Sequence, residues 1–149
     1  MIQRKQTIYL LLALIITVIC LCLPVATLIP QGMGVDMPVY NLWVVEPTGA
    51  HNFSVWALFA ILLLTLPVNI AAIFTYHNRK LQARFCMFNV LLCLGWYVVY
   101  VVFGQVLDYG TFHPAFAAVL PLVAIILYIM ARKAILADEA LVRAADRIR

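Results

Sequence analysis

The side chains best suited to chemistry lie between the apolar runs of this chain. Histidine and carboxylate side chains that face one compartment can assemble a metal site. Two histidines and three carboxylates flank the apolar runs on one side: Asp36, Glu46, His51, Asp108 and His113. Their spacing matches no metal-binding motif, since His51 and His113 merely precede two of the runs. We therefore predict no metal and no cofactor, and interpret these residues as helix caps and loop residues.

The four cysteines lie inside the apolar runs. Cys20 and Cys22 are two positions apart, which on a helix turns them about 200° from each other, so they form neither a shared metal site nor a redox pair. Disulfide frameworks belong to exposed segments, whereas Cys86 and Cys93 are again within apolar sequence. We interpret all four as small hydrophobic residues. Nucleophile-elbow, phosphate-loop and CxxC motifs are absent from the sequence, and we predict that the protein is not an enzyme.

The composition requires lipid as a solvent for much of the chain. Of its 149 residues, 66% are hydrophobic and 11% are charged, against about 45–50% and about 25% in soluble chains. Four charge-free stretches exceed the about 20 residues that a spanning helix needs. Because they are apolar all round, they favour helices over the alternating strands of a barrel. We predict an all-α integral membrane protein with a single domain, a left-handed bundle of four transmembrane helices at about 8–29, 53–76, 85–107 and 114–131.

The basic residues gather on one side of these four spans. The N-terminus, the loop 76–85 and the C-terminus share that side and hold all ten lysines and arginines. The positive-inside rule then places both termini in the cytoplasm. The pI near 9.0 reflects this topology, so we predict no nucleic-acid partner. The first span is too long for a signal-peptide core of about 7–15 residues, and we expect a multi-pass protein of the bacterial cytoplasmic (inner) membrane.

The loop 30–52 is the one long loop on the outer side. Its run 39–45 is rich in β-forming residues and ends at the β-turn sequence EPTG. We expect a small β-like element here, either a short hairpin with 33–37 or an ordered cap that packs on the bundle. Tyr40 and Trp43 would lie at the lipid interface or against helix ends. The cap either closes the outer face or offers these aromatic residues to a partner.

Two asparagines inside the predicted spans are candidates for interhelical polar contacts. Asn69 lies about two turns from the inner end of the second span, and Asn89 about one turn inside the third. We expect the two side chains to approach each other. Contacts of this kind contribute about 0.6 kcal/mol on average between membrane helices. We interpret both as packing contacts, with a substrate-binding amide as the alternative.

The tail 132–149 is the most charged part of the chain. Alanine is the best helix former, and Glu139 precedes Arg143 by four residues, so we predict that the fourth span continues as a cytoplasmic helix. Its apolar stripe is mostly alanine, and within 137–149 three acidic residues balance three basic ones, which disfavours a lipid-surface anchor. The stripe either packs on the loop 76–85 or binds a partner, or the tail is a solvated extension. The stripe comprises Ala134, Ala137, Leu141, Ala144, Ala145 and Ile148.

The two ends of the chain carry a family resemblance. MIQRKQTIYLLLA at the start and DEALVRAADRIR at the end resemble the ends of a family of uncharacterised four-span inner-membrane proteins of the Bacteroidota. The resemblance extends to length and to a long first outer loop. It implies a location in the inner membrane and supplies no catalytic residues. The tripeptide NLW at 41–43 is also similar to the GLW motif of claudins, although the cysteine pair of that family is absent.

Together these patterns predict a non-enzymatic accessory or assembly subunit that binds other integral membrane proteins, for example in an envelope or secretion complex. The predicted spans lack the ionisable residues that mark ion and proton pathways. An alternative is a carrier or channel for a neutral or lipidic small molecule, which a polar path past Asn69 would favour. The predicted partner-binding residues are Ala137, Leu141, Ala144, Ala145 and Ile148 in the tail, and Tyr40 and Trp43 in the outer loop.

Overall fold

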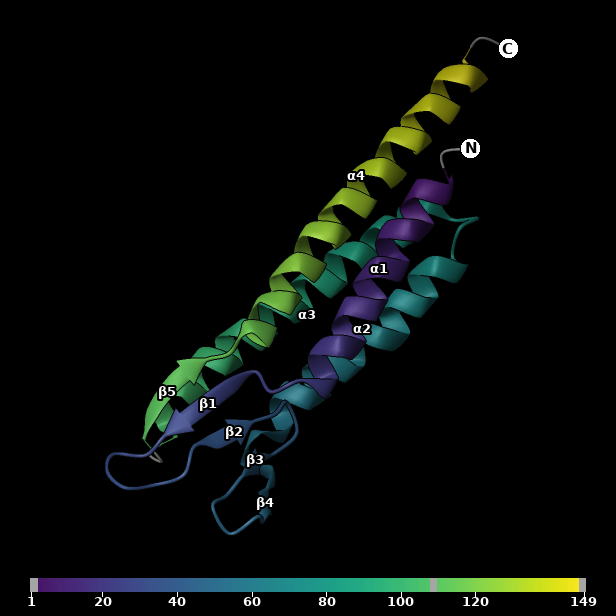
Figure 1. The fold of residues 1–149 in the computed structure, drawn as a ribbon. Coiled ribbons are helices and arrows are strands. Elements are labelled where there is room, and N and C mark those ends of the chain that lie inside the picture. The colour runs from purple at the N-terminus through teal and green to yellow at the C-terminus, as the bar shows by residue number, and fades with distance from the viewer. Residues whose placement is uncertain (1–2, 108–109, 148–149) are drawn as a thin grey trace.

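Four helices lie side by side, and a small sheet covers one end of them (Figure 1). The computed structural model describes residues 3–107 and 110–147. Its four helices are long and apolar enough to cross a membrane, which confirms the prediction of four apolar helices and indicates a multi-pass membrane protein. The elements are α1 (Gln3–Cys22), β1 (Ala26–Ile29), β2 (Met37–Val39), β3 (Val44–Val45), β4 (His51–Asn52), η1 (Phe53–Val55), α2 (Trp56–Phe74), α3 (Arg79–Val106), β5 (Thr111–Pro114), η2 (Phe116–Val119) and α4 (Leu120–Asp146).

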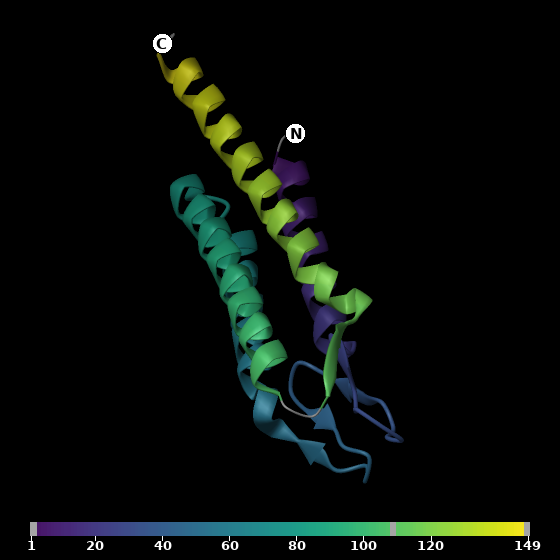
Figure 2. The ribbon, with the colours of Figure 1, turned by 90° about the vertical axis from the view of Figure 1, so that its left-hand side faces the viewer.

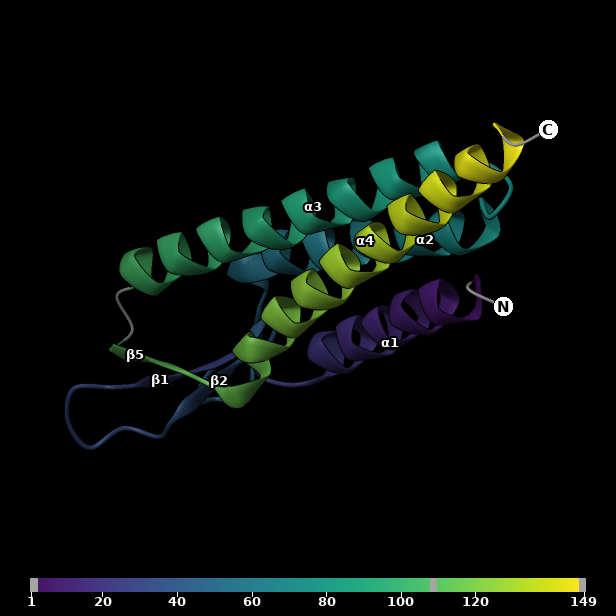
Figure 3. The same ribbon diagram turned by 90° about the horizontal axis from the view of Figure 1, so that it is seen from above.

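The helices form a ring in which each packs on two neighbours. α1 packs most extensively on α4, α2 on α3, and α3 also on α4, while the α1–α2 contact is smaller. Figure 2 shows α4 crossing beside α3, and Figure 3 shows α1 on the other side of α4. Consecutive helices run in opposite directions, so both ends of the chain lie at the end away from the sheet (Figure 1). That end also carries the α2–α3 turn.

The sheet has five antiparallel strands in the order β4-β3-β2-β1-β5. β1 pairs with β2 on one side, Ala26 opposite Val39, and with β5 on the other, Ala26 opposite Pro114. The expected outer β element is therefore present, and the EPTG turn is confirmed by a 2.8 Å bond from Gly49 N–H to the Glu46 carbonyl. The all-α prediction is too narrow, because the structure has a five-stranded sheet and one of its strands, β5, comes from the connection between α3 and α4.

Strands β1 and β2 differ from the predictions. β1 lies in a segment that was predicted to be helical, and β2 has other pairing partners than expected. α1 ends at Cys22, not at residue 29. Pro24 lacks an N–H donor and disfavours helix in the residue before it, and the apolar residues after it form β1. The expected pairing of 33–37 with 39–45 is wrong, since β2 pairs with β1 and β3.

The boundaries of α3 and α4 also differ from the predicted spans. α3 begins at Arg79 rather than at residue 85, because the Asn78 side chain caps it by accepting the Leu81 N–H. α4 begins at Leu120 rather than at residue 114, because Pro114 belongs to β5. α4 then continues without a break to Asp146. The predicted tail is thus a direct extension of the fourth span over the described residues.

The buried side chains form two clusters along the bundle. One lies under the sheet and includes Trp96 and Tyr100. The other lies toward the chain ends and includes Cys86, Tyr128 and Ile135. Many remaining apolar side chains on the four helices are exposed, as expected for a bundle that lipid surrounds.

Candidate functional site

Asp138 ties α4 to the start of α3 near the end of the bundle. The Arg79 Nη1 atom, at the start of α3, lies 3.0 Å from Asp138 Oδ2 and donates a 2.9 Å hydrogen bond to the Asp138 carbonyl oxygen. The Oδ2 contact is electrostatic, since its geometry makes no hydrogen bond there. One turn earlier, the Gln6 amide of α1 donates to the Ala134 carbonyl at 3.2 Å. Beyond Asp138 the helix projects past the bundle (Figure 1).

Three residues of the predicted stripe, Leu141, Ala144 and Ala145, lie on this projecting end, and Ala134 and Ala137 precede Asp138. Ala137, Ala144 and Ala145 are exposed, and Leu141 is 59% exposed. The buried face of α4 instead follows Ile135 and Asp138. The expectation that the stripe packs on the loop 76–85 is therefore wrong for these residues. Ile148, the last predicted residue of the stripe, lies outside the described residues.

A groove of mixed charge separates the projecting end from the α2–α3 turn. It has a volume of about 460 Å³. Glu139 and Arg143 form an ion pair on its α4 wall, one turn apart, as the sequence predicted. The open groove and the exposed stripe together make a surface that a further helix could contact. The groove is lined by His77, Asn78, Arg79, Lys80, Glu139, Val142 and Arg143.

Tyr40 and Trp43 lie where the sheet meets the bundle. Their ring centroids are 5.7 Å apart, and Trp43 also contacts the rings of His51 at 5.2 Å and Phe53 at 6.2 Å. Both line an apolar hollow of about 310 Å³ with Leu21, Cys22, Leu42 and Phe59. The two side chains are half-buried, so they serve the packing of the sheet as well as offering a surface.

Asn41 is the polar residue at this junction that sequence reasoning missed. It is fully buried, and its Nδ2 atom donates to the Cys20 carbonyl at 2.8 Å near the end of α1. Its Oδ1 atom accepts the Trp96 indole N–H at 3.0 Å, and its carbonyl accepts the Phe59 N–H at 3.1 Å. One residue therefore links α1, α2 and α3. The NLW tripeptide marked the position, but its long-range partners could not be read from local sequence.

The aromatic residues of α3 support this junction rather than line a ligand path. Trp96 is fully buried and stacks on Tyr100 with centroids 4.9 Å apart. The Tyr100 hydroxyl donates to the Val25 carbonyl at 2.9 Å, and the Tyr97 hydroxyl donates to the Ala118 carbonyl at 2.7 Å. These bonds hold the segment before β1 and the segment after β5 against α3.

Asn69 and Asn89 are both buried in the helix bundle, but with different partners. Asn69 Nδ2 donates to the Leu10 carbonyl at 3.1 Å and to the Tyr128 hydroxyl at 3.0 Å, which joins α2 to α1 and α4. The sequence predicted that Asn69 approaches Asn89. The bonds of the Asn69 side chain go instead to α1 and α4. Both polar atoms of the Asn89 amide have no hydrogen-bond partner among the described residues. Asn69 Oδ1 is also unpaired.

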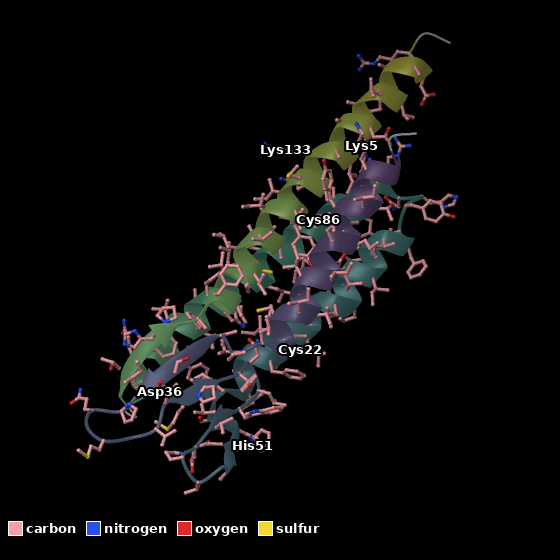
Figure 4. All side chains as sticks on the ribbon, in the orientation of Figure 1. Lys5, Cys22, Asp36, His51, Cys86 and Lys133 are labelled. Carbon is pink, nitrogen blue, oxygen red and sulfur yellow. The ribbon has the colours of Figure 1, made fainter. Side chains whose placement is uncertain are left out.

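The side chains that could bind a metal or form a redox pair are dispersed. Figure 4 shows Asp36 and His51 at the sheet end, and Cys22 and Cys86 at separate levels of the bundle. Within residues 3–107 and 110–147, no three histidine, cysteine or acidic residues are grouped to hold a metal ion. The four cysteines are free thiols, of which Cys22 is exposed. Asp108 lies outside the described residues.

The fold and its surfaces define a multi-pass membrane protein with four apolar helices, a sheet that covers one end, and a helix that projects from the other. A family model, the domain of unknown function DUF4293, matches residues 2–148. The chain therefore belongs to this family. No curated protein matches the chain in sequence.

Proposed function

We propose that the protein is a non-enzymatic accessory or assembly subunit that binds other integral membrane proteins. The observation that carries this proposal is the projecting end of α4, an ordered helix beyond Asp138 whose Leu141 is 59% exposed. A helix that only anchored the fourth span would not need two further turns with apolar side chains. The expected partner contact is a helix of another membrane protein that packs on Ala137, Leu141, Ala144 and Ala145, with Ile148 extending the same stripe in sequence.

Charge and side-chain size support a protein partner over a lipid surface for this end. Interfacial helices place Trp, Phe and Leu opposite Lys and Arg, whereas alanine allows close approach of a second helix. The Glu139–Arg143 pair and the adjoining groove offer polar contacts of both signs beside the stripe. Tyr40 and Trp43 form the second candidate contact, at the opposite end of the molecule.

The proposal includes an orientation in the bacterial cytoplasmic membrane. The basic residues with described side chains lie toward the end that carries both termini, and Asp36 and Glu46 lie at the sheet end. The positive-inside rule then places the α4 end in the cytoplasm and the sheet outside. A fluorescent protein fused at the C-terminus should fold and fluoresce, and alkaline phosphatase inserted at Gly49 should be active. The reverse pattern would overturn this orientation.

The experiment that tests the proposal is mild-detergent purification of the full chain with an affinity tag at its N-terminus, which leaves α4 free. We expect a defined set of membrane proteins to be recovered in constant proportion to the tagged chain. Recovery of the chain alone at native expression level would contradict the proposal.

A carrier for neutral or lipidic small molecules is the second candidate, and the unpaired Asn89 amide favours it. A buried amide without partners in the described part of the bundle is costly and could serve a polar solute. Proteoliposomes that contain the purified chain should then swell in neutral solutes faster than empty liposomes. Equal swelling rates would eliminate a carrier for neutral solutes.

A further inference from the structure

A second groove lies between α3 and α4 and is lined by basic residues without internal counter-charges. Lys80 and Arg84 of α3 and Arg132 of α4 line it, and its volume is about 310 Å³. The ion pairs among the described residues are Arg79 with Asp138 and Arg143 with Glu139. No described carboxylate therefore pairs with the three cations of this groove. Their mutual repulsion makes the groove a place where an external anion would be stabilised.

The groove lies at the boundary between the charged and apolar parts of the bundle. Arg84 directly precedes a charge-free run of α3, and Arg132 directly follows one in α4. Because the two helices are antiparallel, both arginines come at the level where the apolar surface ends. This is the depth at which lipid phosphates lie when the four helices span a bilayer.

One apolar residue of the groove, Met87, lies on the hydrocarbon side of the arginines, whereas Leu136 lies one turn of α4 beyond Arg132 on the other side. Met87 lies one turn of α3 deeper than Arg84 and is 42% exposed. Ala83 is buried and small, which leaves room between the helices beside the arginines. An anion with an apolar chain could therefore place its charge between the arginines and its chain along Met87.

We propose that this groove binds the phosphate of an anionic phospholipid from the surrounding leaflet. Arginine donates two parallel N–H groups to phosphate oxygens, and lysine adds a point charge. Basic pockets between membrane helices bind anionic headgroups for these reasons. The lipid would bridge α3 and α4 just below the point where α4 leaves the bundle, a role separate from partner binding by the projecting end.

The test compares two charge-matched double variants by native mass spectrometry of the full chain in zwitterionic detergent. R84Q/R132Q removes two cations that line the groove. K5Q/K133Q removes two exposed cations that do not line it and lie toward the same end (Figure 4). Phosphatidylglycerol, phosphatidylcholine and inorganic phosphate are added separately. All four substituted side chains are exposed, and circular dichroism checks that each variant remains helical.

We expect the wild-type chain to retain phosphatidylglycerol in preference to phosphatidylcholine. R84Q/R132Q should weaken that retention by roughly 30-fold, from about 1 kcal/mol for each basic residue near the headgroup. K5Q/K133Q should weaken it less, because neither lysine lines the groove, and R84K/R132K should restore most of it. Equal losses in the two Gln double variants would overturn the site. Equal occupancy by inorganic phosphate would overturn its assignment to a lipid, as would equal retention of phosphatidylcholine.

Discussion

At the scale of single residues, Asn41 joins three helices through its side chain and its carbonyl oxygen. The side chain satisfies the Cys20 carbonyl and the Trp96 indole N–H, both in a buried setting. A buried polar group that loses its partner costs about 1–3 kcal/mol. Asn41 therefore belongs to the fold rather than to a surface, although it lies between Tyr40 and Trp43, which are proposed for partner contact.

Asn41→Ala should lower the free energy of unfolding by about 2–4 kcal/mol, because it leaves both buried partners unpaired. Asn78→Ala provides the matched control, since it removes only an exposed helix cap worth about 1 kcal/mol. Equilibrium unfolding in mixed micelles measures both. Equal losses in the two variants would contradict the central role of Asn41.

Asn69→Leu should lower the stability of the bundle, whereas Asn89→Leu should not. Asn69 makes two interhelical bonds, so its replacement should cost about 1 kcal/mol. The Asn89 amide lacks a hydrogen-bond partner within the described residues, so an apolar side chain of similar volume should leave stability unchanged or raise it. The same unfolding assay compares them, and a larger loss for Asn89→Leu would show that its amide is satisfied in the membrane.

At the scale of elements, the four helices could be predicted because charge-free length alone identifies them. The sheet could not be placed in the same way. The apolar run after Pro24 suits either a helix end or a strand, and only its pairing with β2 and β5 selects the strand. Likewise, the sequence predicted the alanine stripe of the tail. Which face of α4 packs on the bundle depends on the contact between Asp138 and Arg79 of α3, which local sequence does not show.

Arg79→Gln should loosen the projecting end of α4. The pair is mostly buried, with side-chain exposures of 24% for Arg79 and 11% for Asp138. Its loss should cost about 1–3 kcal/mol, between the values for exposed and buried pairs. Amide hydrogen exchange over residues 139–146 should become faster while exchange in α2 stays unchanged. Arg147→Gln is the control, because Arg147 is exposed at the end of the helix; equal acceleration in both variants would contradict the account.

At the scale of the whole molecule, the two ends differ in kind. The sheet end is fastened by buried hydrogen bonds from Asn41, Tyr97 and Tyr100. The opposite end has two grooves that α4 forms with the first turns of α3 and that share Lys80, and it extends as a single helix. This asymmetry favours a rigid cap at the sheet end and a surface available for binding at the α4 end. Sequence reasoning could predict the two patterned ends, but it could not identify the junction that makes one of them rigid.

The central claim is that the projecting end of α4 binds another membrane protein, and Leu141→Glu tests it most directly. Leu141 is 59% exposed, so a glutamate there should leave insertion and folding intact while placing a charge in the proposed contact. Leu81→Glu makes the same change at an exposed leucine near the start of α3, outside both grooves. The measurement is the amount of each co-purified membrane protein per tagged chain, by quantitative mass spectrometry.

Leu141→Glu should lower this recovery at least about tenfold, the equivalent of about 1.4 kcal/mol, and Leu81→Glu should retain it. Unchanged recovery from the Leu141→Glu chain, at equal membrane abundance, would contradict the claim.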